Sequence, residues 1–178
     1  MKLPIKISIL AVELTVGFLS CKDSFLDTPP QAALSNTLLE SSKSGVDATL
    51  ISAYKSLGGW TGGGANAWGA APSNWVYNLA ADDFHKGSEP GDGDGWLAVE
   101  LFQWNPAEGS FNDKWRSCYE GINRANSAIL TAKALKKNNA SETAYVSAVE
   151  GEATFLRAWQ HFELYKVFKK APYFTEAD

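Results

Sequence analysis

The chain has 178 residues, 45% of them hydrophobic and 20% charged, so it is long enough for one domain with a buried core and is not composed like a disordered segment. The net charge of -4, without any cluster of Lys and Arg, argues against nucleic-acid binding. Two Cys and two His do not complete a Cys/His zinc site, and no run of 18 apolar residues predicts a membrane-spanning helix.

The first 20 residues have the features of a bacterial lipoprotein signal peptide. Lys2 and Lys6 precede an apolar stretch over residues 7–19, and Cys21 follows it. Cleavage before Cys21 leaves a thiol that can be acylated, and two or three acyl chains anchor a protein stably. We therefore predict a signal peptide over 1–20 and lipidation of Cys21. The alternative is a buried N-terminal helix with an ordinary cysteine, because Glu13 interrupts the apolar stretch.

Residues 21–36 are predicted to form a tether, because Pro29 and Pro30 favour extended backbone. A first helix is predicted from Ser44 to Leu57. Its apolar residues recur at steps of four, four and three and form one stripe: Val46, Leu50, Tyr54 and Leu57. The glycines at 58 and 59 end it.

Residues 58–109 contain eleven of the fifteen Gly and five of the seven Trp. Glycine at this density predicts compact loops around short helical pieces near 73–81 and 95–102. Aromatic rings on a rigid scaffold can bind the faces of sugars. Trp68, Trp75 and Trp96 are therefore candidates for carbohydrate contact. The alternative is that these rings only fix the loops to the helices.

Two long helices are predicted over 112–135 and 141–169, with a break at Asn138 and Asn139. Their apolar residues recur at helical spacing, and Trp115 and Trp159 are predicted to lie in the core. The second helix carries apolar residues on two sides, including Phe155 and Phe162, so it is expected to pack against more than one neighbour. Together they form an antiparallel hairpin of the kind stacked in tetratricopeptide repeats.

The predicted fold is all-α, with tetratricopeptide-like helix pairs and a long Gly/Trp-rich loop region over residues 37–178. Only one such pair is complete, whereas about three are needed to bury the faces of a solenoid. Residues 171–178 add no closing element, so we expect an N-terminal fragment of a longer protein.

No catalytic residue, metal or cofactor is predicted. Cys118 lies in a helical pattern without a nearby His and is expected to be buried. His161 is expected to pack on its helix, and His85 lies in a loop. The acidic residues near position 90 do not fit the spacing of an EF-hand and are expected to be solvated. They are Asp82, Asp83, Glu89, Asp92 and Asp94.

Several segments resemble the SusD/RagB-type nutrient-binding lipoproteins. They are residues 21–30 (CKDSFLDTPP), the loop 82–92 (DDFHKGSEPGD), Trp104 with Pro106, residues 115–126 (WRSCYEGINRAN) and residues 151–158 (GEATFLRA), followed by Phe162, Leu164, Tyr165 and Pro172. The matches occur in the same order as in the family and cover most of the chain after Cys21.

The resemblance implies a mostly helical protein on the outer face of a Gram-negative outer membrane, held there by its lipid anchor. Family members cover TonB-dependent transporters of the SusC type, capture glycans or peptides, and are not enzymes. The expected partners are therefore a glycan (a polysaccharide or oligosaccharide), a SusC-like transporter and the membrane, with no nucleic acid.

Two other functions remain open from the sequence. A helical-repeat protein that binds only a peptide or a transporter would bury the three tryptophans and expose an apolar patch on the Trp159 helix. A glycan hydrolase would need two acids about 5 to 9.5 Å apart across a cleft. Exposure of Asp82, Asp83, Glu89 and Asp94 to solvent would argue against the hydrolase.

Overall fold

The computed structural model describes residues 35–58 and 75–178. The predicted signal peptide, Cys21, nearly all of the tether and Trp68 lie outside these residues. Every regular element in the described ranges is helical, as predicted. Within those ranges, no helix has the length and apolar character needed to cross a membrane.

The first elements are the short helix α2 (Asn36–Leu39) and the helix α3 (Lys43–Lys55), which continues as a 3-10 turn over Ser56–Gly58. Ser42 caps α3, because its side-chain oxygen accepts a hydrogen bond from the amide of Gly45 at 3.2 Å. A Cβ atom on Gly45 would lie 2.2 Å from the carbonyl oxygen of Leu39, so the α2–α3 turn requires glycine there. The structure confirms the predicted helix over 44–57.

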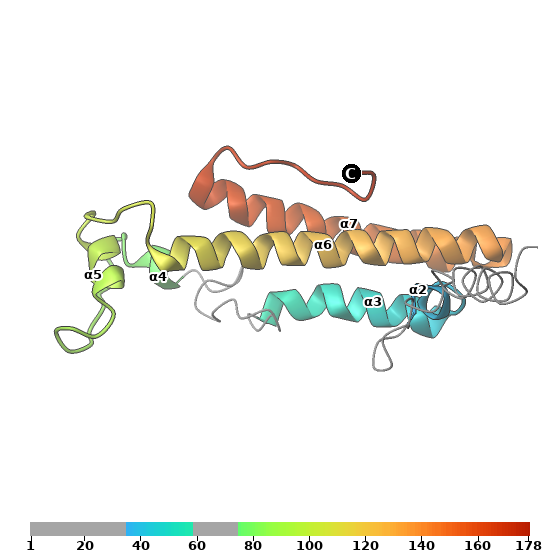
Figure 1. Cartoon of the computed structure of the whole chain (residues 1–178), viewed down its shortest axis with the longest axis horizontal. Coiled ribbons are helices and arrows are strands. Elements are labelled where there is room, and N and C mark those ends of the chain that lie inside the picture. The colour runs from blue at the N-terminus through green and yellow to red at the C-terminus, as the bar shows by residue number, and fades with distance from the viewer. Residues whose placement is uncertain (1–34, 59–74) are drawn as a thin grey trace, which may run out of the picture. The chain divides into compact units, whose positions relative to one another are not determined.

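The two longest helices are α6 (Gly109–Asn138) and α7 (Thr143–Phe168), joined through a 3-10 turn over Ala140–Glu142. The side-chain oxygen of Asn139 accepts hydrogen bonds from the amide and hydroxyl of Ser141, at 3.3 and 2.8 Å, and stabilises this turn. Figure 1 shows α6 and α7 side by side and antiparallel, which confirms the predicted hairpin.

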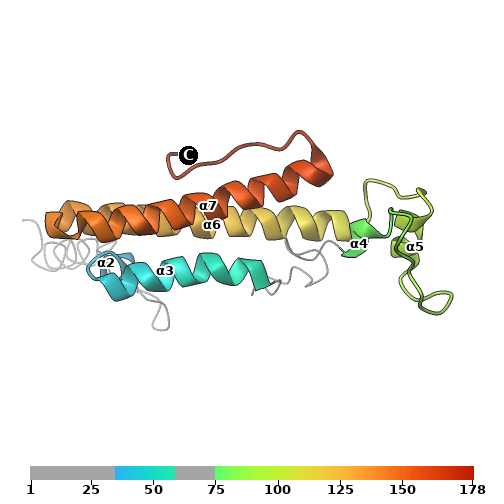
Figure 2. The same cartoon turned by 180° about the vertical axis from the view of Figure 1, so that it is seen from behind.

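The main core lies where α3 packs along the α6–α7 hairpin, as the two opposite views show (Figures 1 and 2). Small residues let the helices approach, and branched residues fill the space between them. The buried cluster contains Val46, Leu50, Ala53, Ala125, Ala128, Ile129, Ala132, Leu135, Val146, Val149, Ala153 and Leu156. Burying one branched side chain of this kind contributes roughly 1.5–3 kcal/mol, so α3 adds substantially to stability.

A second core cluster surrounds Cys118 between the first half of α6 and the last half of α7. It contains Cys118, Ile122 and Leu164, with the partly buried Trp115 and Trp159 packed against it. The rings of Trp115 and Phe168 meet edge to face, with centroids 5.1 Å apart. Both helical tryptophans therefore contact the core, as predicted.

Two short helices, α4 (Trp75–Asn78) and α5 (Asp94–Glu100), lie near the N-terminal end of α6 (Figure 1). They confirm the predicted helical pieces but are shorter than the ranges 73–81 and 95–102. Gly93 precedes α5 with a φ of 66°, and a Cβ atom there would lie 2.4 Å from the ring of Trp96. Glycine is therefore needed for both the backbone conformation and the position of the indole.

The last residues form a segment that returns along the helix hairpin (Figure 1), where the sequence suggested an end without a closing element. The hydroxyl of Tyr119 donates to the carbonyl of Pro172 at 2.7 Å. The ring of Tyr173 stacks on His161, with centroids 4.3 Å apart. Glu176 forms ion pairs with Lys133 and Arg157. Contacts to both α6 and α7 thus hold residues 171–178.

Helix α7 packs against both α6 and α3, so it has more than one neighbour, as expected, but the side that carries Phe155 and Phe162 faces neither of them. Val149, Leu156 and Leu164 are buried, but Phe155 and Phe162 are 66% and 56% exposed. Among the described residues no second helix covers this side, because α3 and α6 both pack against other faces of α7.

Candidate functional site

The three tryptophans proposed for carbohydrate contact differ in what the structure shows of them. Trp68 lies outside the described residues, and Trp75 begins α4 but its side chain lies outside the description. Trp96 is partly buried and packs against Leu79 and Val99. The indole of Trp96 therefore fixes α5 to the loop that follows α4, which was the alternative role considered for these rings.

An exposed pair of aromatic rings instead follows α5. Phe102 and Trp104 are 67% and 43% exposed, and their ring centroids lie 5.5 Å apart. Phe102 has a φ of 56°, an uncommon backbone conformation for a residue with a side chain. The exposed Gln103 and Asn105 flank Trp104 in sequence and supply polar groups beside the rings.

Trp104 also lines two adjacent cavities at the N-terminal end of α6. One has a volume of about 210 Å³ and is lined by Tyr77, Ala80, Val99, Trp104, Phe111, Lys166 and Val167. The other has a volume of about 390 Å³ and is lined by Trp104, Pro106, Phe111, Val167 and Phe168. The residues that both share are Trp104, Phe111 and Val167, so the two cavities form one mostly apolar depression beside the exposed rings.

A buried charge network includes Lys166, which lines the smaller of these cavities. The ammonium of Lys114 contacts the carboxylate of Glu163 at 2.9 Å, and both side chains are almost fully buried. Lys166 forms a second ion pair with Glu163 at 2.5 Å. Burial alone raises the pKa of Glu163, but hydrogen bonds from Lys166 and Lys114 outweigh burial and hold that pKa below its ordinary value. Glu163 therefore stays charged at neutral pH.

Tyr77 connects this network to the depression. Its hydroxyl donates to the carbonyl of Ser110 at 2.8 Å, and its ring lies over Lys114, 5.6 Å from the ammonium. Desolvation, with smaller contributions from nearby acidic groups, raises the pKa of Tyr77 far above its ordinary value. The phenol therefore remains neutral and holds α4 on α6.

The loop over 82–93 folds around the side chain of Lys86. Its ammonium donates to the hydroxyl of Ser88 at 2.8 Å and to the carbonyls of Glu89 and Asp92 at 3.3 and 2.5 Å. Glu100 of α5 accepts from the amide of Lys86 at 2.9 Å and pairs with His85. These hydrogen bonds, with the amide contributing most, lower the pKa of Glu100. His85 thus has a structural contact that the sequence did not predict.

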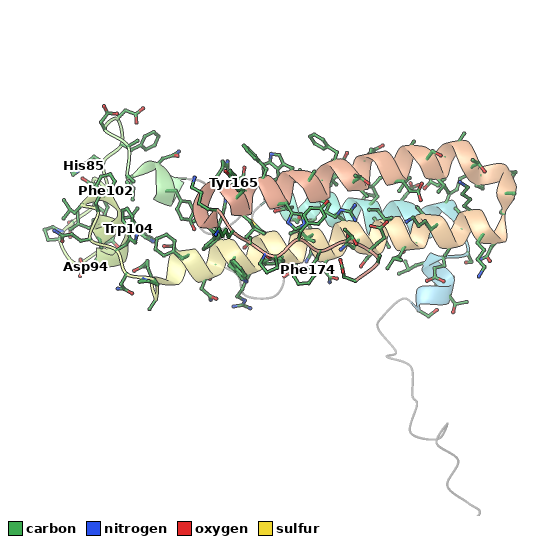
Figure 3. The ribbon with its side chains drawn as sticks, turned by 90° about the horizontal axis from the view of Figure 1, so that it is seen from above. His85, Asp94, Phe102, Trp104, Tyr165 and Phe174 are labelled. Atoms are coloured by element: carbon green, nitrogen blue, oxygen red, sulfur yellow. The ribbon has the colours of Figure 1, made fainter. Side chains whose placement is uncertain are left out.

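Figure 3 shows Phe102 and Trp104 gathered with His85 and Asp94 at the α4–α5 end of the hairpin. Asp82, Asp83, Glu89 and Asp94 are all exposed, which is the arrangement that argues against a hydrolase using them. Within the described ranges, no group of three or more His, Cys, Asp or Glu side chains is placed to hold a metal ion.

A second set of cavities lies where the C-terminal segment crosses α6. Two cavities of about 320 and 520 Å³ both have Tyr119 and Phe174 in their walls. The rings of these two residues meet edge to face at 5.7 Å. Asn123, Asn126 and Asp178 add polar groups to the smaller cavity. Phe174 lies along the hairpin in Figure 3, away from the Phe102–Trp104 pair.

The sequence reasoning missed both aromatic sites. Trp104 lies in the Gly- and Trp-rich region, but its sequence context does not distinguish it from the other tryptophans there. The one available signal was the run of Phe102, Gln103, Trp104 and Asn105, which alternates aromatic and polar side chains. Spacing alone does not show that Trp96 faces inward while Trp104 faces solvent.

The motifs over 115–126 and 151–158 contribute to helix packing. The guanidinium of Arg157 donates to the side-chain oxygen of Asn126 at 2.9 Å in the interior. Gly121 leaves room for Gln160, since a Cβ atom at residue 121 would lie 2.4 Å from its amide nitrogen. Cys118 is fully buried, as predicted, and burial raises its thiol pKa to about 12. His161 packs against Tyr173, as expected of a helix-packing histidine.

The fold and site together define an all-helical protein with exposed aromatic rings and no membrane-spanning helix in its described part. A SusD-like family, described as starch-binding and associating with the outer membrane, matches residues 24–178. The chain therefore belongs to this SusD-like family of starch-binding, outer-membrane-associated proteins. Comparison with curated proteins and with solved structures gave no match.

Proposed function

We propose that the protein is a cell-surface lipoprotein of the outer membrane that captures glycans for uptake through a TonB-dependent, SusC-like transporter. It acts as a binding protein and not as an enzyme. Family membership supports glycan binding and outer-membrane association. The observation that carries the proposal for this chain is the exposed Phe102–Trp104 pair beside an apolar depression.

The chemistry of this surface suits a sugar. Flat aromatic rings bury the C–H faces of pyranose rings, and neighbouring amides hydrogen-bond to hydroxyls. Trp104 supplies the larger face, with Gln103 and Asn105 beside it. Trp68 and Trp75 remain proposed ligand contacts, whereas Trp96 is proposed to act by positioning α5.

The test is calorimetry of the full chain, carrying Cys21→Ser to prevent lipidation, against a panel of polysaccharides. We expect binding to a glucan, weakened at least tenfold by Trp104→Ala, which corresponds to about 1.4 kcal/mol. Phe155→Ala removes an exposed aromatic ring of α7 that does not line this surface, and it serves as the control. Binding that is equally strong in the Trp104 variant would place the glycan elsewhere, and no binding to any glycan would reject the proposal.

The proposed anchor has a separate test. Mass spectrometry of the protein extracted from membranes should show a mature chain that begins at Cys21 and carries acyl groups. A chain that retains residues 1–20 would contradict the anchor and leave the glycan proposal untouched. Co-purification of the lipidated protein with a transporter from the outer membrane tests the proposed partner.

A second candidate function is a protein-interaction module that binds a peptide or only its transporter. The observation that favours it is the exposed apolar side of α7, with Phe155, Phe162 and Tyr165 each more than half exposed. Absence of glycan binding, with a folded chain and a bound peptide or transporter, would support this candidate.

A further inference from the structure

The loop between α4 and α5 partly buries a lysine and exposes a phenylalanine. Over residues 81–92, Lys86 is partly buried and every other residue is exposed. Phe84, two residues before Lys86, is 47% exposed. Lysine is normally among the most exposed residues, and phenylalanine is among the most buried. The position of Lys86 in this loop therefore needs a specific cause.

The cause is a set of oxygen atoms around the ammonium of Lys86. The ammonium donates to the hydroxyl of Ser88 at 2.8 Å and to the carbonyls of Glu89 and Asp92 at 3.3 and 2.5 Å. These three hydrogen bonds match the three donors of an ammonium group. All three acceptors are uncharged oxygens, and backbone carbonyls of this kind also bind metal cations in proteins. The ammonium thus stands where a loop of this type could hold a separate cation.

The sequence of the loop suits this arrangement. Gly87 and Gly91 have φ values of 65° and 89°, in the region that favours glycine, and they let the backbone turn around the ammonium. Between Lys55 and Lys114, Lys86 is the only Lys or Arg. Its charge offsets the mutual repulsion of the acids over residues 82–100. These acids are Asp82, Asp83, Glu89, Asp92, Asp94 and Glu100.

Lys86 contacts both ends of α5. Its amide donates at 2.9 Å to the carboxylate of Glu100, the last residue of the helix. Its ammonium binds the carbonyl of Asp92, two residues before the helix begins. The preceding residue, His85, also pairs with Glu100, and Figure 3 shows it in the group of side chains around Trp104. A helix of seven residues is not stable by itself, so its position depends on contacts of this kind.

The end of α5 determines where the exposed aromatic pair lies. The amide of Phe102 donates to the carbonyl of Val99 at 3.2 Å, and the amide of Gln103 donates to the carbonyl of Ala98 at 2.7 Å. Phe102 also has a positive φ, a conformation that persists only where the surrounding structure holds it. A displacement of α5 would therefore move Phe102 and Trp104 together.

We infer that Lys86 is a positioning residue whose ammonium acts as a built-in cation of the loop over 82–93, fixes α5 and so sets the orientation of the Phe102–Trp104 pair. The inference deepens the proposed glycan site, and its consequence for binding rests on the proposed function. Lys86 acts through α5, so its effect is present in the protein without a ligand.

Hydrogen exchange of the full chain with Cys21→Ser, measured without glycan, tests the positioning role. Lys86→Met keeps most of the aliphatic stem and removes the charge. The amides of Phe102 and Gln103 should then exchange about tenfold faster, because α5 opens more readily. Amides of α7 should be unchanged, since neither main core cluster contains residues of this loop. Lys137→Ala, which removes an exposed lysine at the other end of α6, is the matched control.

Chemical rescue tests whether the charge is responsible. Lys86→Ala removes a segment that n-propylammonium reproduces, and n-propanol is its uncharged counterpart. We expect n-propylammonium to slow the exchange of the Phe102 and Gln103 amides toward the parent rate, at constant ionic strength, and n-propanol to have no such effect. Equal effects of the two compounds, or no effect of the amine, would overturn the role of a built-in cation.

Calorimetry with a glucan separates this inference from the proposed function. Lys86→Met should weaken binding about tenfold, and Lys137→Ala should leave it unchanged. If exchange behaves as expected but the parent chain binds no glycan, the proposed function fails and the positioning role stands. Unchanged exchange in Lys86→Met would overturn the inference. So would an undiminished affinity of Lys86→Met for a glucan whose binding Trp104→Ala weakens.

Discussion

Single residues at the α6–α7 interface show why the motifs over 115–126 and 151–158 have the composition they do. Asn126 and Arg157 hydrogen-bond across the interface, and Gly121 makes space for Gln160. Gln160 in turn donates to the hydroxyl of Ser56 at 3.0 Å and so connects α7 to the end of α3. A buried hydrogen bond of this type contributes about 1 kcal/mol, and leaving one partner unpaired costs more.

Gly121→Ala should destabilise the fold by about 1–3 kcal/mol, because the new Cβ atom collides with the side-chain amide of Gln160. Urea unfolding measures the change. Combining it with Gln160→Ala should cost less than the sum of the two single changes, since the colliding group is gone. Gly109→Ala is the control, because a Cβ atom there meets nothing within 4 Å. Additive effects would show that the two residues do not interact.

Glu163→Ala should destabilise the fold by about 3–5 kcal/mol, because the buried ammonium of Lys114 loses its carboxylate. Replacing both groups by apolar residues of similar size, Lys114→Met with Glu163→Leu, should restore most of that stability. Thermal unfolding measures both. Lys43→Ala is the control, because Lys43 is exposed and pairs with Glu142 at the surface, so its loss should cost less than about 1 kcal/mol. A double variant as unstable as Glu163→Ala would contradict this account.

The returning C-terminal segment is held mainly by side chains whose contacts are not apparent from their spacing in the sequence. Tyr119 and His161 contact its backbone and rings, and Glu176 bridges Lys133 of α6 and Arg157 of α7. Hydrogen bonds from Lys133 and Arg157 lower the pKa of Glu176 to about 2. The segment therefore braces the hairpin while Glu176 is ionised.

This bridge predicts a pH dependence. The folded-state pKa of Glu176 lies below its ordinary value of 4.5, so its stabilisation is present above that value and is lost as the pH falls toward 2. The difference in unfolding free energy between the parent chain and Glu176→Gln should be constant above about pH 5 and small near pH 2. Urea unfolding over that range measures it. A difference that does not change with pH would show that the carboxylate charge is not responsible.

The helices themselves were largely predictable from their sequence, and the way they pack was less so. Apolar spacing located α3, α6 and α7, because the period of a helix fixes which side chains share a face. The spacing on α7 also revealed two apolar faces, but it did not show that one faces solvent. The buried Lys114–Glu163 pair escaped notice because charged residues are normally exposed, and only the packing of α6 on α7 brings them together.

The accessibility of the Cys118 thiol to a modifying reagent measures how far the whole molecule has unfolded. Its thiol is fully buried in the second core cluster, and burial raises its pKa to about 12. In the Cys21→Ser chain, iodoacetamide at neutral pH should therefore modify Cys118 only as fast as the core opens. The modified fraction should rise along the urea unfolding curve measured by circular dichroism. Rapid modification of the folded chain would show that this part of the core opens locally.

The candidate ligand surface was harder to predict than the fold for a physical reason. Trp96 and Trp104 both lie in the Gly- and Trp-rich region over residues 58–109, yet Trp96 packs against Leu79 and Val99 whereas Trp104 is exposed. That difference depends on the turn at Gly93 and the conformation of Phe102, which no periodic pattern encodes. The family resemblance indicates the functional class. Only the three-dimensional structure shows which aromatic rings are exposed to solvent.

The bundle has an architectural consequence for how such a protein can diversify. Its main core comes from α3, α6 and α7, and the described part of the connection between α3 and α6, residues 75–108, supplies none of its buried residues. Lengthening such a connection is inexpensive, since each doubling costs only about 0.6 kcal/mol of closure entropy. The connection between α3 and α6 can therefore vary in length and sequence while the core of α3, α6 and α7 is retained. The same helical scaffold can in this way acquire different ligand preferences.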